Sequence, residues 1–216
     1  MIIVIQCAAT KRPGAGHLTL PDGKPVAFLA DPESAPNDDT CVHARPDDQA
    51  ENDRTWRDQL LSYNDVEGNP LGLYKAYYLY ENQIYGRLVD RFGPNNVYIL
   101  SAGWGLVSAD FLLPYYDITF SQSAEPYKRR RKTDRSYRDF CMLPRGTDEH
   151  IIFFGGKDYV PLFCALTNAA KGVRKVFYNS AQEPKAPGCM LERFDTPTKT
   201  NWHYECTKQF LSDRRP

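Results

Sequence analysis

The chain has 216 residues, of which 42% are hydrophobic and 25% are charged. This is the composition of a globular protein, and it excludes a chain that is disordered throughout. Basic and acidic residues number 27 each and the formal net charge is zero, so a nucleic-acid interface would need a local cluster of cations rather than a general positive field.

The first predicted element is a strand over residues 2–7, where a continuous apolar run ends in small and polar residues. Such a run is typical of a strand that is buried on both faces of a parallel sheet. The run is too short for a signal sequence or a membrane span, and no basic segment precedes it. We therefore expect a cytoplasmic protein without a membrane partner.

The segment over residues 14–54 predicts an insertion into the fold. Residues 17–29 have the pattern of a hairpin that turns at Pro21-Asp22-Gly23. Residues 31–54 are rich in Asp, Pro, Asn and Glu, which is a composition typical of loops. The insertion is expected to be either a lid over the site or a loop that faces solvent.

Strands and helices alternate in the remainder of the chain. Apolar runs predict strands over 97–101, 151–154 and 173–178, and apolar residues at helical spacing predict helices over 73–92, 159–170 and 202–211. This alternation predicts a single α/β domain, a three-layer α/β/α fold with a mostly parallel central sheet. Ligands on such sheets bind beyond the carboxyl ends of the strands.

The six cysteines are widely separated and never form a C-x-x-C pair, which is the usual spacing of a zinc ribbon. We expect reduced thiols, and no cofactor or metal. One alternative stays open, because metal ligands can come from distant parts of a chain. The residues that could assemble such a site are Cys41, His43, Cys189, His203 and Cys206.

The densest cluster of candidate functional residues lies between Leu100 and Asp117, where a buried strand leads into a Gly-Trp-Gly turn. Aromatic rings can hold a planar base by stacking, and a carboxylate can orient water or stabilise positive charge on a sugar. The alternative is that the aromatic residues belong to the core and the aspartates to turns. The candidates are Trp104, Gly105, Asp110, Tyr115, Tyr116 and Asp117.

Four short blocks resemble the DUF6884 family: residues 6–11, 101–107, 114–117 and 154–159. More distantly, they are similar to the YaaA peroxide-stress proteins. Both groups look related to the uracil-DNA glycosylase superfamily and to deazaguanine-processing proteins, and some antiphage DNA glycosylases look similar too. The sequence departs from the commoner motif at Trp104, where that motif has Tyr, and in the long insertion.

The resemblance implies a uracil-DNA-glycosylase-like fold and a DNA glycosylase that extrudes and excises a modified base, as antiviral enzymes do. Cleavage of an N-glycosidic bond needs a carboxylate near the sugar, for which Asp110 is the first candidate, Asp117 the second and Asp158 the third. The expected base pocket comprises Cys7, Ala8, Trp104, Gly105, Tyr115, Tyr116 and Asn179. Catalysis by the Cys7 thiol is disfavoured, because no histidine lies near it in the sequence.

Basic residues in two kinds of segment are candidates for DNA phosphates. The first kind follows the strands, and the second is a basic run with tyrosines on either side. The strand-end candidates are Lys11, Arg12, Gly155, Gly156 and Lys157. The run consists of Lys128, Arg129, Arg130, Arg131 and Lys132.

Two other functions are compatible with the same residues. One is a hydrolase or transferase that acts on free nucleotides. The other is a non-catalytic DNA-binding stress protein similar to YaaA, which would bind DNA in a salt-sensitive way without forming a product. We expect a monomer in each case.

Overall fold

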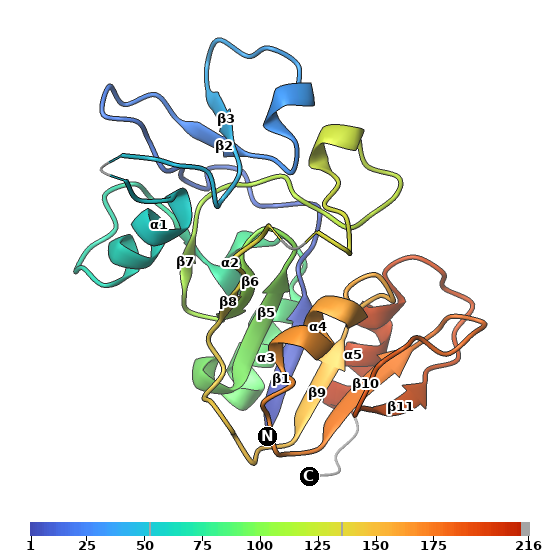
Figure 1. Cartoon of the computed structure of the whole chain (residues 1–216). Helices are drawn as coiled ribbons and strands as arrows, with labels where there is room; N and C mark the ends of the chain where they lie inside the picture. The colour runs from blue at the N-terminus through green and yellow to red at the C-terminus, as the bar shows by residue number, and fades with distance from the viewer. Residues whose placement is uncertain (52, 135, 213–216) are drawn as a thin grey trace.

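The computed structural model describes residues 1–51, 53–134 and 136–212, which form an α/β fold around a seven-stranded mixed sheet (Figure 1). The strands lie in the order β11-β10-β9-β1-β5-β6-β8. β1 (Ile2–Gln6) is central and pairs in parallel with β5 (Val97–Ser101) and β9 (Ile151–Phe154). β10 (Arg174–Tyr178) continues the parallel part. The prediction of a mostly parallel sheet is confirmed.

The three central parallel strands, β1, β5 and β9, form where apolar residues face both sides of the sheet. All four residues of β9 and all five of β5 are buried, as the continuous apolar runs predicted. Three strands of the seven-stranded sheet escaped prediction, namely β6 (Gly105–Ser108), β8 (Phe140–Cys141) and β11 (Met190–Arg193). β6 runs antiparallel to β5, so the chain reverses at residues 102–104.

Helices cover both faces of the sheet. α3 (Ile84–Phe92) and α5 (Trp202–Ser212) pack against each other on one face, and α4 (Val160–Leu166) lies on the other face (Figure 1). Within the described ranges no helix is long and apolar enough to cross a membrane.

The predicted helix over 73–92 is wrong in its first half. The chain instead forms β4 (Tyr74–Lys75), the short α2 (Ala76–Leu79) and, after a break, α3. Tyr80 is extended and bridges to Lys11, and Asn82 Oδ1 accepts a hydrogen bond of 2.9 Å from the Ile84 amide. The bridge of Tyr80 to a distant strand end and the side-chain hydrogen bond of Asn82 therefore interrupt the helix that the spacing of apolar residues predicted.

The insertion forms a small unit above the sheet (Figure 1). It contains β2 (Val26–Phe28) and β3 (Val42–Ala44), which pair in parallel, and the 3-10 helix η1 (Pro32–Ser34). α1 (Trp56–Asn64), which was not predicted, follows the insertion and begins with a Thr55–Asp58 capping box. Phe28 packs the unit against the core, since the centroids of the Phe28 and Trp104 rings lie 5.0 Å apart. The remaining elements are β7 (Leu112–Leu113), η2 (Pro94–Asn96) and η3 (Pro126–Lys128).

Candidate functional site

A cavity of about 660 Å³ opens at the carboxyl ends of β1 and β9. The strand order reverses here, because the chain continues from β1 to β5 on one side and from β9 to β10 on the other. Ligands of open α/β sheets bind at such a point, and this volume is typical of small-molecule sites. Residues 6–10 after β1 and Gly156, Asp158 and Tyr159 after β9 line the cavity. The topology thus brings together Cys7, Ala8 and Gly156 from two separate sequence blocks.

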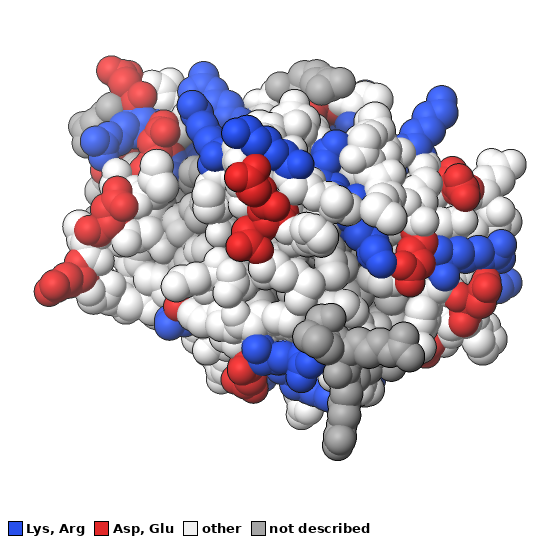
Figure 2. Space-filling view, turned by 90° about the horizontal axis from the view of Figure 1, so that it is seen from below, with Lys and Arg blue, Asp and Glu red and all other residues white. Residues whose placement is uncertain are grey.

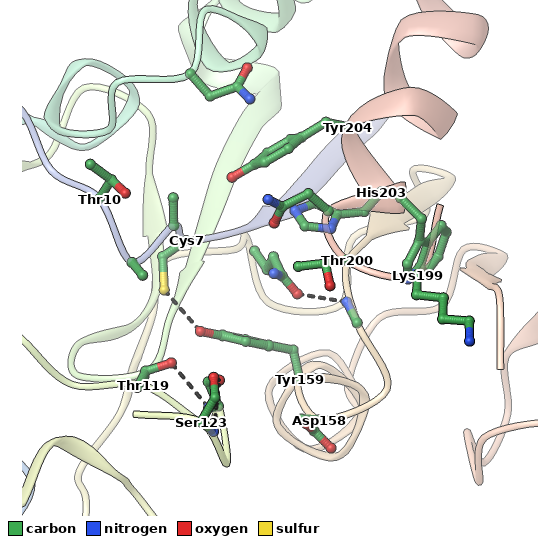
Figure 3. A pocket seen from close by; sticks show the side chains of 18 of the residues that line it. Cys7, Thr10, Thr119, Ser123, Asp158, Tyr159, Lys199, Thr200, His203 and Tyr204 are labelled. Carbon is green, nitrogen blue, oxygen red and sulfur yellow. Dashed lines mark hydrogen bonds between the residues drawn. The ribbon is translucent and has the colours of Figure 1, made fainter. Parts of the chain in front are cut away.

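The amino end of α5 supplies a second wall of the cavity, made of residues 199–204 (Figure 3). Asn201 precedes the helix with a φ of 61°, a left-handed conformation that asparagine tolerates better than most residues. Three ring-bearing residues of the first turn, Trp202, His203 and Tyr204, line the cavity. Lys199 is exposed at its rim.

Tyrosine hydroxyls and one thiol form the floor. Cys7 Sγ lies 3.2 Å from the Tyr159 hydroxyl (Figure 3), and the Tyr85 hydroxyl donates to the Gln6 carbonyl at 2.9 Å. The Tyr85 and Tyr204 hydroxyls lie 3.0 Å apart. Burial raises the pKa of Tyr204 to about 12 and the pKa values of Tyr85 and Tyr159 well above their usual range. These hydroxyls therefore stay protonated and act as neutral hydrogen-bonding groups.

His203 is the most unusual polar group in the lining. Only 2% of it is exposed, and its Nε2 is buried without a hydrogen-bond partner among the residues that the structure describes. Burial lowers the pKa of His203 to about 4, so the ring is neutral at physiological pH. A buried nitrogen without a partner is costly unless a water molecule or a ligand satisfies it.

Lys11 does not reach a phosphate-facing surface. It is 8% exposed, and its ammonium lies 4.3 Å from the centroid of the Tyr116 ring. The Tyr116 hydroxyl is 2.8 Å from the Tyr80 hydroxyl and accepts a hydrogen bond of 2.8 Å from Ser101 Oγ. Burial lowers the pKa of Lys11, although the negative field of Cys7 opposes this effect. Tyr116 likewise is fully buried and belongs to this internal network.

The structure does not bring Asp110 and Asp117 together. Asp110 is exposed and pairs with Lys75 at 3.2 Å. It lies at the amino ends of the parallel strands, because the amide of its neighbour Ala109 donates to the Val97 carbonyl at the start of β5. The β5–β6 reversal moves it to the edge opposite the cavity. Asp117 pairs with Lys128 at 2.9 Å, and together with Tyr115 it lines a different cavity of about 320 Å³.

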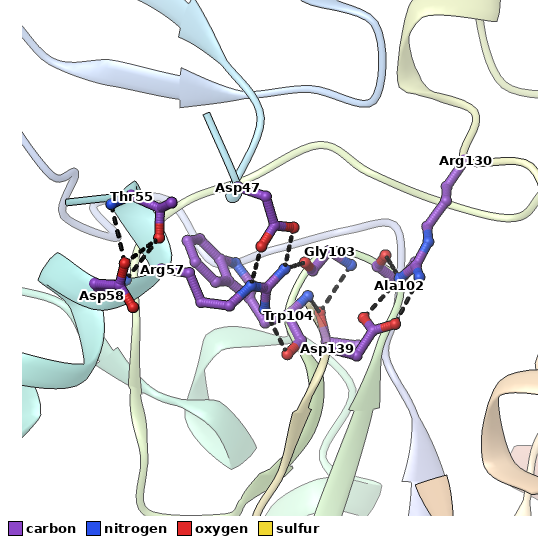
Figure 4. A network of polar contacts seen from close by, with 10 residues as sticks. Asp47, Thr55, Arg57, Asp58, Ala102, Gly103, Trp104, Arg130 and Asp139 are labelled. Carbon is purple, nitrogen blue, oxygen red and sulfur yellow. Dashed lines mark hydrogen bonds and ion pairs between the residues drawn. The ribbon is translucent and has the colours of Figure 1, made fainter. Parts of the chain in front are cut away.

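The Gly-Trp-Gly turn is part of the core and not a wall of the main cavity. Trp104 is completely buried, and Gly105 has a φ of +89° against the backbone of Phe140. Two buried arginines hold the turn (Figure 4): Arg57 donates to the Gly103 and Trp104 carbonyls at 3.0 and 2.9 Å, and Arg130 donates to the Ala102 carbonyl at 2.8 Å. The aromatic residue expected to stack on a base thus packs against protein.

Internal ion pairs neutralise most of the basic run. Arg130 binds Asp139 through two hydrogen bonds of 2.7 and 2.6 Å, Lys128 pairs with Asp117, and Lys132 pairs with Asp158. Arg129 is half-buried and Arg131 is exposed. Cations and anions are also interspersed over the face at the amino ends of the strands (Figure 2). Three of the five cations in the run are thus paired with carboxylates of the same chain, and phosphate binding by the run stays a prediction.

The other predicted residues lie around the site or away from it. Gly155 is buried against Phe153, whereas Lys157 is exposed beside the cavity loop. Arg12 donates to the Tyr78 carbonyl at 2.8 Å, and Asn179 Nδ2 donates to the Thr196 carbonyl at 3.3 Å. None of these four residues is among the described residues that line the cavity.

Sequence reasoning missed the polar residues that come from outside the strand-end loops. Glu81 and Asn82 enter the cavity from the break between α2 and α3, and Thr119 and Ser123 enter from the segment before the basic run. The available signal was Asn82 just before α3, because asparagine favours turns and the starts of helices.

No protein-family model, curated protein or solved structure matches the chain. The relation to the uracil-DNA glycosylase superfamily therefore stays a prediction, and the chemistry of the site has to be inferred from the residues that form it.

Proposed function

We propose that the cavity at the carboxyl ends of β1 and β9 binds a nucleotide and that the protein hydrolyses the N-glycosidic bond of this ligand. The observation that carries the proposal is the lining of a switch-point cavity of about 660 Å³ by hydrogen-bonding amides and hydroxyls together with the carboxylate of Glu81. The amides of Asn82 and Asn201 suit the edge of a base, and the Tyr204 ring offers an aromatic surface. The resemblance noted in the sequence implies the same class of reaction.

Glu81 is the carboxylate that we assign to the sugar. Cleavage of the N-glycosidic bond generates positive charge on the sugar, which a nearby carboxylate stabilises. Glu81 and Asp158 both line the cavity, but Asp158 is paired with Lys132. Within the described ranges Glu81 forms no ion pair. Its charge is therefore available to the substrate.

The amino end of α5 suits the phosphate of the substrate. A helix amino terminus carries partial positive charge and free amides, which favour an anion. Lys199 adds a full positive charge at the rim of the cavity, and His203 in the first turn adds a buried ring nitrogen that has no hydrogen-bond partner among the described residues. Phosphate binding here would orient the sugar and base toward Glu81.

A free nucleotide fits these features better than a nucleotide within duplex DNA. Duplex binding depends on several cations that contact phosphates. Three of the five cations in the basic run pair with acidic side chains of the same chain. Excision of a modified base from DNA stays a prediction that the same experiment tests.

The test incubates the purified protein with a panel of ribo- and deoxyribonucleoside monophosphates, including modified bases, and with duplexes that carry the same bases. Chromatography measures the released base. We expect release from at least one monophosphate, and a loss of about 100-fold or more in Glu81→Gln, the range of a general acid or base. Asp110→Asn is the matched control, because Asp110 lies at the opposite edge of the sheet, and it should react like the unmodified protein.

Four results would contradict the proposal. Full activity in Glu81→Gln would refute the role that we assign to the Glu81 carboxylate. Equal losses of activity in Glu81→Gln and Asp110→Asn would indicate a general effect of lost charge. Release from duplexes but not from monophosphates would support the DNA glycosylase instead. Salt-sensitive DNA binding without any released base would support the non-catalytic DNA-binding protein.

A further inference from the structure

Three side chains that are typical metal ligands converge in the insertion. A carboxylate oxygen of Asp38, Sγ of Cys41 and a ring nitrogen of His43 all lie within 4.8 Å of one another. His43 is the central residue of β3 and is opposite Ala27 of β2, so its backbone is fixed by a strand pair. Asp38 is exposed, and Cys41 and His43 are partly buried.

We propose that Asp38, Cys41 and His43 bind a divalent transition-metal ion of the zinc class. A thiolate, an imidazole and a carboxylate together form a borderline-soft ligand set that zinc prefers over magnesium or calcium. Ligands at zinc bond lengths around a tetrahedral ion lie roughly 3.3–3.6 Å apart. Cys41 Sγ and Asp38 Oδ2 already lie at such a distance, 3.4 Å, and no separation in the group exceeds 4.8 Å, so small rotations of the exposed Asp38 side chain and its neighbours suffice to close the site.

The contacts of Asp38 already orient its carboxylate toward the thiol. Oδ1 accepts hydrogen bonds from the Thr40 amide at 2.8 Å and from Thr40 Oγ1 at 2.6 Å. Oδ2 accepts a hydrogen bond from the Cys41 thiol, with a sulfur-to-oxygen distance of 3.4 Å. When the metal binds, the thiol proton leaves to solvent, and the sulfur and Oδ2 each form a bond to the ion. Outer contacts such as those of Thr40 typically support metal affinity.

Metal binding at this site should strengthen as the pH rises. The reason is that a thiol binds a metal as the thiolate, so protons compete with the ion for the sulfur.

The site leaves one position of the metal open. The three ligands line the second cavity, of about 320 Å³, together with Tyr115 and Asp117. Asp117 is already paired with Lys128, so it is not an additional ligand. Three protein ligands with an open fourth position are typical of zinc sites that bind an exchangeable water or a small anion. The site is separate from the cavity at the ends of β1 and β9, and it does not depend on the function proposed for that cavity.

Cobalt(II) spectroscopy tests the site with the full chain. The protein is stripped with a chelator, reduced, and titrated with Co²⁺ alone. We expect a thiolate-to-cobalt charge-transfer band that saturates at one equivalent and disappears when Zn²⁺ is added. Cys41→Ser should remove the band, whereas Cys141→Ser should keep it, because Cys141 is exposed and contacts the Leu166 carbonyl elsewhere.

His43 and a second readout complete the design. His43→Ala should weaken metal binding by about 100-fold or more, a larger loss than is usual for outer contacts, and His150→Ala should not weaken it. Zn²⁺ should also protect Cys41, but not Cys141, from alkylation in the unmodified protein, which needs no variant to fold. A band that persists in Cys41→Ser, an absence of saturable binding, or equal alkylation of both thiols would overturn the proposal.

Discussion

Arg130 is the member of the basic run whose replacement should cost the most stability. Its side chain is 4% exposed and that of its partner Asp139 is 9% exposed. Arg130→Met keeps much of the apolar stem but leaves the Asp139 carboxylate buried without its cation and the Ala102 carbonyl without a donor. Breaking a buried pair in this way costs about 3–5 kcal/mol. For a chain of this size that corresponds to a fall of roughly 6–20 °C in melting temperature.

Urea denaturation of Arg130→Met and Arg131→Met measures this difference. Arg131 is exposed, so its replacement should change the free energy of unfolding by less than about 0.5 kcal/mol. Arg130→Met combined with Asp139→Leu should recover part of the loss, because no uncompensated charge remains. Equal effects of the two single replacements would refute the reasoning, since Arg130 would then be a solvated cation that is available to bind phosphate.

Two further predictions concern His203 and Gly105. Because burial lowers the pKa of His203 from 6.5 to about 4, only the unfolded chain binds a proton between these values, and stability should fall by up to about 3 kcal/mol as the pH drops from 6.5 to 4. Urea unfolding across this range should show a shallower fall for His203→Gln, and identical slopes would contradict the assignment. Gly105→Ala should cost about 2 kcal/mol or more in thermal unfolding, because φ is +89° and a Cβ would lie 2.5 Å from the Phe140 carbonyl oxygen. Gly86→Ala is its control: in the middle of α3 with open space around it, it should stabilise the fold by about 1 kcal/mol, and equal melting of both variants would contradict the strain at Gly105.

The buried strands could be predicted from the sequence because their physical requirement is local. A strand covered on both faces needs a continuous apolar run, and β5 and β9 match the predicted ranges for this reason. β11 has no such run: Met190 is 58% exposed and its neighbours are mostly polar. β6 was missed for a different reason. Its pairing depends on a reversal at residues 102–104, and two arginines that come from distant segments hold this reversal.

The residues of the candidate site could be predicted only where the order and direction of the strands alone determine where a residue lies. The carboxyl ends of neighbouring parallel strands must meet, so Cys7, Ala8 and Gly156 share one cavity. Asp110 follows a strand of opposite direction, which a pattern of apolar residues does not reveal. Glu81 and His203 lie outside the strand-end segments, and their positions depend on how α3 and α5 pack on the sheet.

The segments with the most charged and aromatic residues in the sequence proved to be the ones that hold the fold together. Arg57, Arg130 and Trp104 direct their polar and aromatic groups toward one turn, where each cation has an aspartate partner. A carboxylate or guanidinium in such a pair has little charge left for a ligand. The cavity instead combines one carboxylate without an ion pair among the described residues, Glu81, and the exposed Lys199 with amides, hydroxyls and a neutral imidazole. The charged groups suit the sugar and the phosphate, whereas the amides and hydroxyls recognise a ligand through the direction of hydrogen bonds, which is the requirement for distinguishing one nucleobase from another.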